Sequence, residues 1–198
     1  MFYAAQKGNL NEVRTAVDAG APMEWASPHS RSAEALKRSD DYGGQRAVHI
    51  ASWKGHKDVV AFLGSRGADV NAGNNNQQTP LHFAAIEGHA SVCTTLLALG
   101  ANPTTKDNDG DTALDDARRQ NKTECVAMLE AAVWKACGGP EALAAVAAAV
   151  EAGDREKAAA AQKVLEEVAS AAGIAVSASF LYLHAACVFF LSRSPLLF

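Results

Sequence analysis

The chain lacks several features on which common functions depend. Its 198 residues carry a net charge of −4, so it has no clustered excess of lysine and arginine of the kind that binds nucleic acid. No basic stretch followed by an apolar core opens the chain, so we expect no secretory signal. No nucleophile stands beside a base in a recognisable motif, and no glycine-rich loop is placed to cradle a phosphate. We therefore expect neither an enzyme nor a nucleic-acid-binding protein.

Cysteine is scarce and unpatterned. The four cysteines, Cys93, Cys125, Cys137 and Cys187, include no C-x-x-C pair and have no histidine at zinc-ligand distance. A zinc site is therefore not expected, and we expect neither a metal nor a cofactor elsewhere. Free thiols fit a reducing compartment, so we expect a cytoplasmic protein, with the nucleus as an alternative.

Charge is missing altogether from one stretch near the end of the chain. Residues 173–192 contain no Asp, Glu, Lys or Arg, and as a helix they would extend about 30 Å, enough to cross a bilayer core. The basic cytosolic flank of a tail anchor is missing before this stretch. Three alternatives stay open: a membrane anchor, a helix that folds back onto the preceding helices, and an irregular tail.

What the sequence does contain is an internal period of 33 residues. The matching positions carry the same or similar residues in consecutive units, which indicates a repeat architecture. Three such sets are His49, His82 and Asp115; Ala51, Ala84 and Ala117; and Gly55, Gly88 and Asn121.

The clearest unit predicts two antiparallel helices joined by a short turn. Thr79 can cap the first helix, and Pro80 suits its first position because the missing N–H costs nothing there. Gly88 can end that helix with a positive φ. A second apolar stripe at Val92, Leu96 and Leu97 then predicts the second helix.

The run from Thr79 to Ala85, Thr-Pro-Leu-His-Phe-Ala-Ala, resembles the signature of the ankyrin-repeat family. The resemblance extends over residues 1–134 and implies an all-α solenoid of helix-turn-helix units with protruding turns. Three units with turns, at about 41–73, 74–106 and 107–134, follow an opening half-unit. The resemblance also implies that His49 and His82 hydrogen-bond to the backbone of neighbouring loops.

Three departures from the repeat pattern stand out. Arg46 and Ala47 replace the Thr-Pro pair of the second unit, so we expect a looser first helix there, because a lost cap costs about 1 kcal/mol. In the fourth unit Asp115 replaces the histidine and Asn121 the glycine, which indicates a degenerate closing repeat. The spacing between the first two units is 14 residues too long, and this insertion falls within residues 22–40. Insertions in repeat arrays form loops, often on the binding face, so its Trp25 either anchors a partner or folds back on the helices.

In the ankyrin family, partners usually dock in a concave groove lined by the first helices and the turn tips. Trp53 stands out there, because a large aromatic residue at a variable outward position is typical of an interface hot spot. The alternative is that Trp53 covers the neighbouring repeat or the insertion. Transfer of positions, together with Trp25 from the insertion, gives these candidate partner-binding residues: Trp25, Tyr42, Gln45, Trp53, Lys54, Asn75, Asn76, Gln78, Ile86, Glu87, Asp109, Asp111, Arg119 and Gln120.

The resemblance therefore implies a non-catalytic, monomeric adaptor or scaffold that binds another protein through the groove and the turn tips. The alternative is a tail-anchored membrane adaptor or assembly factor that presents the same repeats to the cytosol. Deleting residues 173–198 distinguishes the two, because only a tail-anchored protein would be released from membranes.

The acidic run from Asp107 to Asp111 invites a calcium-loop interpretation. In that register Thr105 would occupy the first ligand position and Asp116 the twelfth. The expected carboxylate is then missing at the first position and the bidentate glutamate at the last. The repeat register favours a turn instead, with Asp109 and Gly110 at its tip.

Alanine dominates the segment after the repeats. Residues 141–152 and 154–172 are strong helix candidates, with Asp154 as the cap of the second. Their apolar stripes are thin, so the pair either docks loosely or stands out as a helical stalk. The sequence thus predicts three regions: a repeat domain at 1–134, an alanine-rich helical segment at 135–172 and a hydrophobic tail at 173–198.

Overall fold

A computed structural model describes residues 1–23, 43–152 and 155–171. Trp25, Tyr42, most of the insertion and the hydrophobic tail lie outside these ranges. The chain divides into two units, Met1–Leu129 and Glu130–Phe198. The predicted all-α class is confirmed: the described ranges contain helices and one isolated bridge, between Lys106 and Thr112, but no extended strand.

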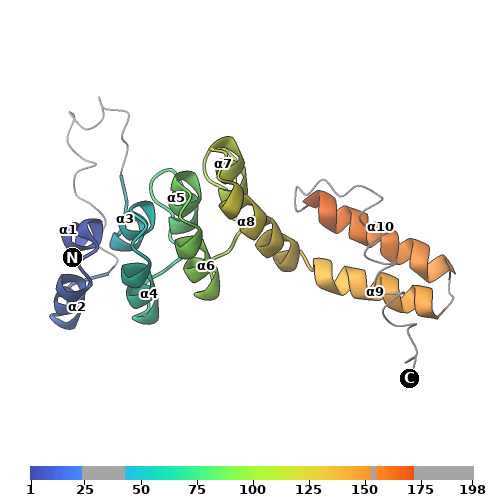
Figure 1. Ribbon diagram of the computed structural model, residues 1–198, viewed down its shortest axis with the longest axis horizontal. Helices are drawn as coiled ribbons and strands as arrows, with labels where there is room; N and C mark the ends of the chain where they lie inside the picture. The colour runs from blue at the N-terminus through green and yellow to red at the C-terminus, as the bar shows by residue number, and fades with distance from the viewer. Residues whose placement is uncertain (24–42, 153–154, 172–198) are drawn as a thin grey trace, which may run out of the picture. The chain divides into compact units, whose positions relative to one another are not determined.

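The first unit is built from consecutive antiparallel helix pairs, as the period of 33 predicts (Figure 1). Within each pair a short turn joins a first helix to a second, and a longer segment leads to the next pair. The pairs are α1 (Phe2–Lys7) with α2 (Leu10–Asp18), α3 (Ala47–Trp53) with α4 (Lys57–Ser65), α5 (Pro80–Glu87) with α6 (Ala90–Ala98), and α7 (Ala113–Arg119) with α8 (Thr123–Ala136).

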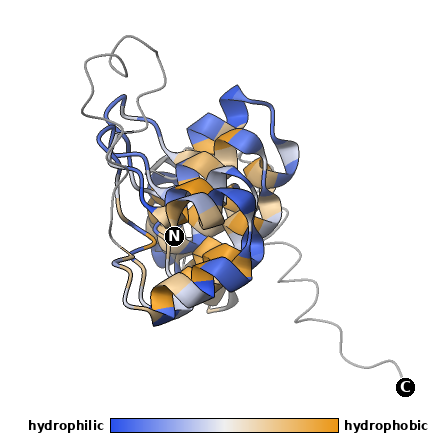
Figure 2. Cartoon of the chain, turned by 90° about the vertical axis from the view of Figure 1, so that its left-hand side faces the viewer, coloured by the Kyte–Doolittle hydropathy of each residue, from blue (hydrophilic) through white to orange (hydrophobic). Residues whose placement is uncertain are grey.

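Small residues set the spacing of the first helices. Helix α5 packs against α3 on one side and α7 on the other, while the second helices α2, α4 and α6 form a parallel layer. Ala51, Ala84 and Ala117 are fully buried along the row of first helices, because a residue without a long side chain lets neighbouring backbones approach closely. Figure 2 shows apolar colour on the packed helix faces and hydrophilic colour on the projecting turns.

Helix boundaries follow the residues that the repeat pattern singles out. Pro80 is the first residue of α5, and Gly88 follows its last residue with φ +87°. Asn121 replaces this glycine in the fourth unit and keeps the left-handed conformation at φ +54°. Asparagine tolerates this conformation better than other non-glycine residues, so the fourth pair keeps the same geometry.

Histidines connect each helix pair to the next. His49 accepts a hydrogen bond from the Arg46 N–H at Nδ1 (3.1 Å) and donates from Nε2 to the Ala72 carbonyl (2.9 Å). His82 likewise accepts from the Thr79 N–H (3.1 Å) and donates to the Asp111 carbonyl (3.3 Å). The role that the family resemblance implies for these two histidines is confirmed.

The fourth unit does not repeat this connection. Asp115 stands at the histidine position, and its Oδ2 accepts from the Thr112 N–H (3.0 Å) and hydroxyl (2.7 Å). The carboxylate therefore caps its own helix, as the imidazole does elsewhere. Since it has no N–H, it cannot donate to the carbonyl of a following turn.

The second unit contains a helical hairpin. Helices α9 (Gly139–Glu151) and α10 (Arg155–Ala171) pack against each other, close to the two helices that the sequence predicts at 141–152 and 154–172. The proposed cap Asp154 lies outside the described residues. Val146 and Leu165 form the small buried core, with Trp134 at its edge.

No helix in the described ranges has both the length and the apolar character needed to cross a membrane. The uncharged stretch at 173–192 lies beyond those ranges.

Candidate binding surface

Two side chains from each of three first helices form what we call the first-helix surface. They occupy the last turn of α3 and α5 and the end of α7, at positions related by the period of 33. Its members are Trp53 and Lys54, Ile86 and Glu87, and Arg119 and Gln120. All six are candidates from the sequence, and all six have solvent-accessible side chains: Trp53 and Ile86 are half-buried, and the other four are exposed.

Trp53 joins the second unit of the repeat to the third. Its indole Nε1–H donates to Oε1 of Glu87 at 2.9 Å, and the Lys54 ammonium lies 3.8 Å from the centroid of its ring. The indole therefore has one polar partner on the next helix and one cation over its face. The Trp53 side chain is half-buried, so part of it stays accessible. Its role as a partner contact stays a prediction.

The backbone under Trp53 is held in place by the third unit. His89, the residue after the turn glycine Gly88, donates from Nε2 to the Trp53 carbonyl at 3.1 Å. His56 makes the same bond to the Gln6 carbonyl at 3.0 Å, one repeat earlier. The ends of the first helices are thus tied to the following repeat, which positions the outward side chains.

The turns are connected by a backbone ladder. The Asn75 N–H donates to the Gly43 carbonyl at 2.9 Å, and the Asn108 N–H donates to the Asn76 carbonyl at 3.0 Å. The Asn108 amide also donates to the Asn75 carbonyl at 3.2 Å. The Asn75 side chain is exposed, and the side chains of Asn76 and Gln78 are half-buried. The turns therefore form a continuous edge beside the first helices.

The prediction that Gln45 is exposed is wrong. Gln45 is 1% exposed, whereas its counterpart Gln78 is half-buried. The turn before α3 contains Gly43 and Gly44, and it fits tightly against the next turn: a Cβ at Gly44 would lie 2.6 Å from Oδ1 of Asn75. Gln45 lies next to this closely packed turn in the sequence, and a comparison of positions between repeats does not reveal that it is buried.

The fourth turn is held together by its own first aspartate. Asp107 Oδ1 accepts from the N–H groups of Asp109 and Asp111, both at 3.0 Å. Gly110 has φ +86° at the tip. The Asp107 carboxylate therefore acts as the hydrogen-bond acceptor for backbone N–H groups of a tight turn, which explains the acidic run without calcium. Among the described residues, no group of three or more His, Cys, Asp or Glu side chains is placed to hold a metal ion.

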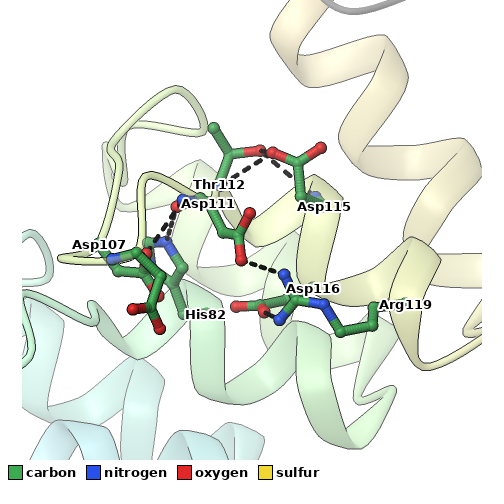
Figure 3. Close-up of polar contacts among 8 residues, drawn as sticks. His82, Asp107, Asp111, Thr112, Asp115, Asp116 and Arg119 are labelled. Carbon is green, nitrogen blue, oxygen red and sulfur yellow. Dashed lines mark hydrogen bonds and ion pairs between the residues drawn. The ribbon is translucent and has the colours of Figure 1, made fainter.

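Arg119 bridges two carboxylates beside this turn. One guanidinium nitrogen pairs with Asp111 Oδ2, and the other lies 3.2 Å from Oδ1 of Asp116 (Figure 3). Asp111 belongs to the turn and Asp116 to α7. The arginine therefore ties the turn to the helix that follows it.

Asp116 is a functional candidate that the sequence analysis missed. It is 3% exposed, and no described group donates a hydrogen bond to its Oδ2. Burial raises the pKa of this carboxyl to about 6, opposed by Arg119 and assisted by Asp107, Asp111 and Asp115. The signal was available, since the equivalent positions one and two repeats earlier hold the apolar residues Phe83 and Ile50.

Comparison with known proteins agrees with this geometry. No curated protein matches the chain. Residues 1–63 match the family described as "Ankyrin repeats (many copies)", and residues 67–133 match the one described as "Ankyrin repeats (3 copies)". With the period of 33, the stacked helix pairs and the bridging histidines, these matches show that the chain belongs to the ankyrin-repeat family.

Proposed function

We propose that this protein is a non-catalytic adaptor or scaffold that binds a partner protein through the concave side formed by its first helices and turn tips. Ankyrin repeats are in general protein–protein interaction modules. The finer proposal names the place: the first-helix surface, with the turn tips at Asn75, Asp109 and Asp111 beside it.

The observation that carries the proposal is the arrangement of Trp53. An aromatic ring that is half-buried and fixed by Glu87, Lys54 and its own tethered carbonyl presents apolar area with little side-chain freedom left to lose. Ordered aromatic residues of this kind dominate interface energetics, because binding then costs little further side-chain entropy. Ile86 occupies the equivalent position on the next helix and extends the apolar area.

The decisive experiment compares two aromatic truncations. Trp53→Ala removes the proposed anchor, and Phe62→Ala, on the second helix α4, removes another half-buried aromatic residue outside the proposed surface. Tagged wild-type and variant proteins are used to capture cross-linked partners from cell extract. We expect Trp53→Ala to weaken capture by about tenfold or more, in the range of a hot spot, while Phe62→Ala retains it.

The thermal transition is measured in parallel. Trp53→Ala should shift it only slightly, because the ring is half-exposed. If Trp53→Ala retained every partner, or if it unfolded the protein, the proposed surface would be wrong.

A membrane-tethered form of the same module is a second proposal, and it rests only on the uncharged residues 173–192. Comparing the membrane fraction of the full chain with that of a chain ending at residue 172 tests it. Equal partition of the two proteins would rule out the tether. In the absence of a tether, we propose a cytoplasmic or nuclear protein on the basis of its composition and cysteine usage.

A further inference from the structure

The charge of the turn and first helix changes from unit to unit along the stack. Residues 41–54 contain two cations, Arg46 and Lys54, and one anion, Asp41. Residues 74–87 contain a single charged side chain, the carboxylate of Glu87. Residues 107–120 contain five carboxylates and two arginines. The net charge of this stretch is therefore +1, −1 and −3 in the second, third and fourth units, so the fourth unit is the most acidic.

The acidic residues of the fourth unit are gathered on one side of it. Figure 3 shows Asp107, Asp111, Asp115 and Asp116 around the start of α7, with the Arg119 guanidinium among them. Asp109 is exposed at the tip of the same turn. Burial raises the pKa of Asp116, Arg119 opposes this rise, and Asp107, Asp111 and Asp115 add to it.

The buried carboxylate of Asp116 is an independent sign of a missing cationic donor. Its Oδ1 pairs with Arg119, while among the described groups none donates to Oδ2. A buried acceptor without a donor lowers stability, and more so when it is charged. An Arg or Lys side chain bound at the surface beside this buried oxygen would balance part of the negative charge around it.

The apolar part of the first-helix surface, at Trp53, is separated from the acidic fourth unit by one helix. Trp53 on α3 and Arg119 on α7 are separated by one first helix, α5. Packed neighbouring helices lie about 8–10 Å apart, so the separation is about 20 Å. An extended chain covers about 3.3 Å per residue, so about six residues span it.

We propose that the partner contributes a basic linear segment, whose Arg or Lys residues bind the acidic turn and α7 of the fourth unit while an apolar residue about six positions away contacts Trp53 and Ile86. This inference rests on the proposed function and adds the chemistry of the partner. Charge complementarity selects it, because an acidic or neutral segment would leave the surplus of carboxylates unbalanced.

The test starts from a random library of displayed twelve-residue peptides, selected on the full-length protein. We expect the enriched peptides to carry net positive charge, with an apolar residue about six positions from an Arg or Lys. Affinity of the enriched peptides is then measured by fluorescence polarisation at low and at physiological salt. Binding should weaken with salt, because exposed charge pairs are screened.

Two variants of equal charge change locate the binding site. Asp109→Asn removes a carboxylate from the proposed site. It changes the Asp-Gly pair at the turn tip to Asn-Gly, which suits such turns equally well. Asp58→Asn removes an exposed carboxylate at the start of α4, on the second-helix layer. We expect Asp109→Asn to weaken the enriched peptides by about three- to fivefold, the size of an exposed charge pair, and Asp58→Asn to leave them unchanged.

The result for Trp53→Ala distinguishes failure of the basic-segment inference from failure of the proposed function on which it rests. Loss of binding in Trp53→Ala, with no response to Asp109→Asn or with enrichment of acidic or neutral peptides, overturns the basic-segment inference alone. Retention of binding in Trp53→Ala, or failure to enrich any peptide, contradicts the proposed surface and the inference together. Basic peptides that depend on both Trp53 and Asp109 support both.

Discussion

Two buried histidines, at equivalent positions of consecutive units, connect the start of their own helix to the next turn. His49 and His82 accept a backbone hydrogen bond at Nδ1 and donate one at Nε2. Only the neutral imidazole can do both, because protonation removes the acceptor. Burial accordingly lowers the pKa of His49 to about 4, and it lowers the pKa of His82 as well. The connection between turns therefore depends on pH.

Acid should weaken the fold through His49. Because its folded pKa is below the unfolded value of 6.5, its contribution is complete above pH 6.5 and is lost as the pH falls through about 4. A shift of this size corresponds to about 3 kcal/mol. Urea unfolding between pH 7 and pH 4 measures the loss, and an NMR titration of the His49 ring gives its pKa. A midpoint near 6.5 for His49 would contradict this assignment.

Asp116 also affects how the free energy of unfolding depends on pH, in the opposite direction to His49. Its folded pKa is raised from 3.8 to about 6, so its contribution is complete below pH 3.8 and is lost as the pH rises through about 6. Acidification therefore relieves the cost of this buried charge while it damages the histidine connections. We expect Asp116→Asn to lose stability more steeply than wild type between pH 6 and pH 4, since only the histidine effect remains.

Gln77 occupies a position that favours glycine. Gly44 and Gly110 stand one repeat before and after it with φ +77° and +86°, and Gln77 adopts φ +59°. The left-handed conformation costs a non-glycine residue about 1–2 kcal/mol, while glycine loses more backbone entropy on folding, by about 0.5–1 kcal/mol. We therefore expect Gln77→Gly to raise the free energy of unfolding by about 0.5–1 kcal/mol, measured by thermal or urea unfolding. Gln77→Ala is the control and should bring no gain, because alanine keeps the strained φ.

At the scale of the element, α3 begins in the repeat register although its sequence departs from the pattern. It starts at Ala47, and Arg46 is extended at φ −98° and ψ 168°, as Thr79 is before α5 at φ −87° and ψ 166°. The His49 ring and tertiary packing therefore hold a helix start that lacks both the threonine and the proline. The looser first helix expected from Arg46 and Ala47 stays a prediction.

Restoring the proline should stabilise α3. Ala47 is the first helical residue, where proline loses no hydrogen bond, and the extended Arg46 is compatible with a following proline. We expect Ala47→Pro to raise the free energy of unfolding by about 0.4–1 kcal/mol, because it restricts the unfolded chain. Ala113→Pro, at the equivalent start of α7, is a matched second site. A lower melting temperature for Ala47→Pro would show that its φ or its packing is not that of Pro80.

At the scale of the whole molecule, α8 completes the repeat unit and also leads into the second unit. Cys125 and Leu129 are fully buried within the first unit. The Cys93 and Cys125 thiols are hydrogen-bonded, and the Thr94 hydroxyl donates to the Met128 sulfur at 2.8 Å. The repeats therefore need the first half of α8 as their closing layer.

Truncation tests this division. A chain ending at Cys137 keeps α8, and we expect its repeat unfolding transition to stay within about 0.5 kcal/mol of the full chain, as for independent regions. A chain ending at Lys122 exposes the layer covered by Cys125 and Leu129 and should lose several kcal/mol, since one buried leucine alone contributes about 1.5–3 kcal/mol. Thermal unfolding followed by circular dichroism measures both. Equal stability of the two truncations would show that α8 is not part of the repeat core.

The repeat fold matched at residues 1–63 and 67–133 is predictable from the sequence alone, and all six positions of the first-helix surface are candidates named from the sequence. A period of 33 repeats the same local signals, such as Pro80, Gly88 and the histidines, so helix starts, helix ends and outward positions can be transferred between units. Local signals of this kind act within one or two turns of helix, and the stacking of identical units then follows from burying their apolar faces.

Other properties depend on contacts between repeat units and become visible only in the packed structure. Gln45 is buried, the Trp53 ring is hydrogen-bonded to a glutamate 34 residues away, and Asp116 lies buried beside Arg119. Burial and electrostatic field at these positions arise from side chains that are distant in sequence. The period therefore identifies which residues face outward in general, while only the packed stack shows which of them are enclosed, tethered or charged against their neighbours.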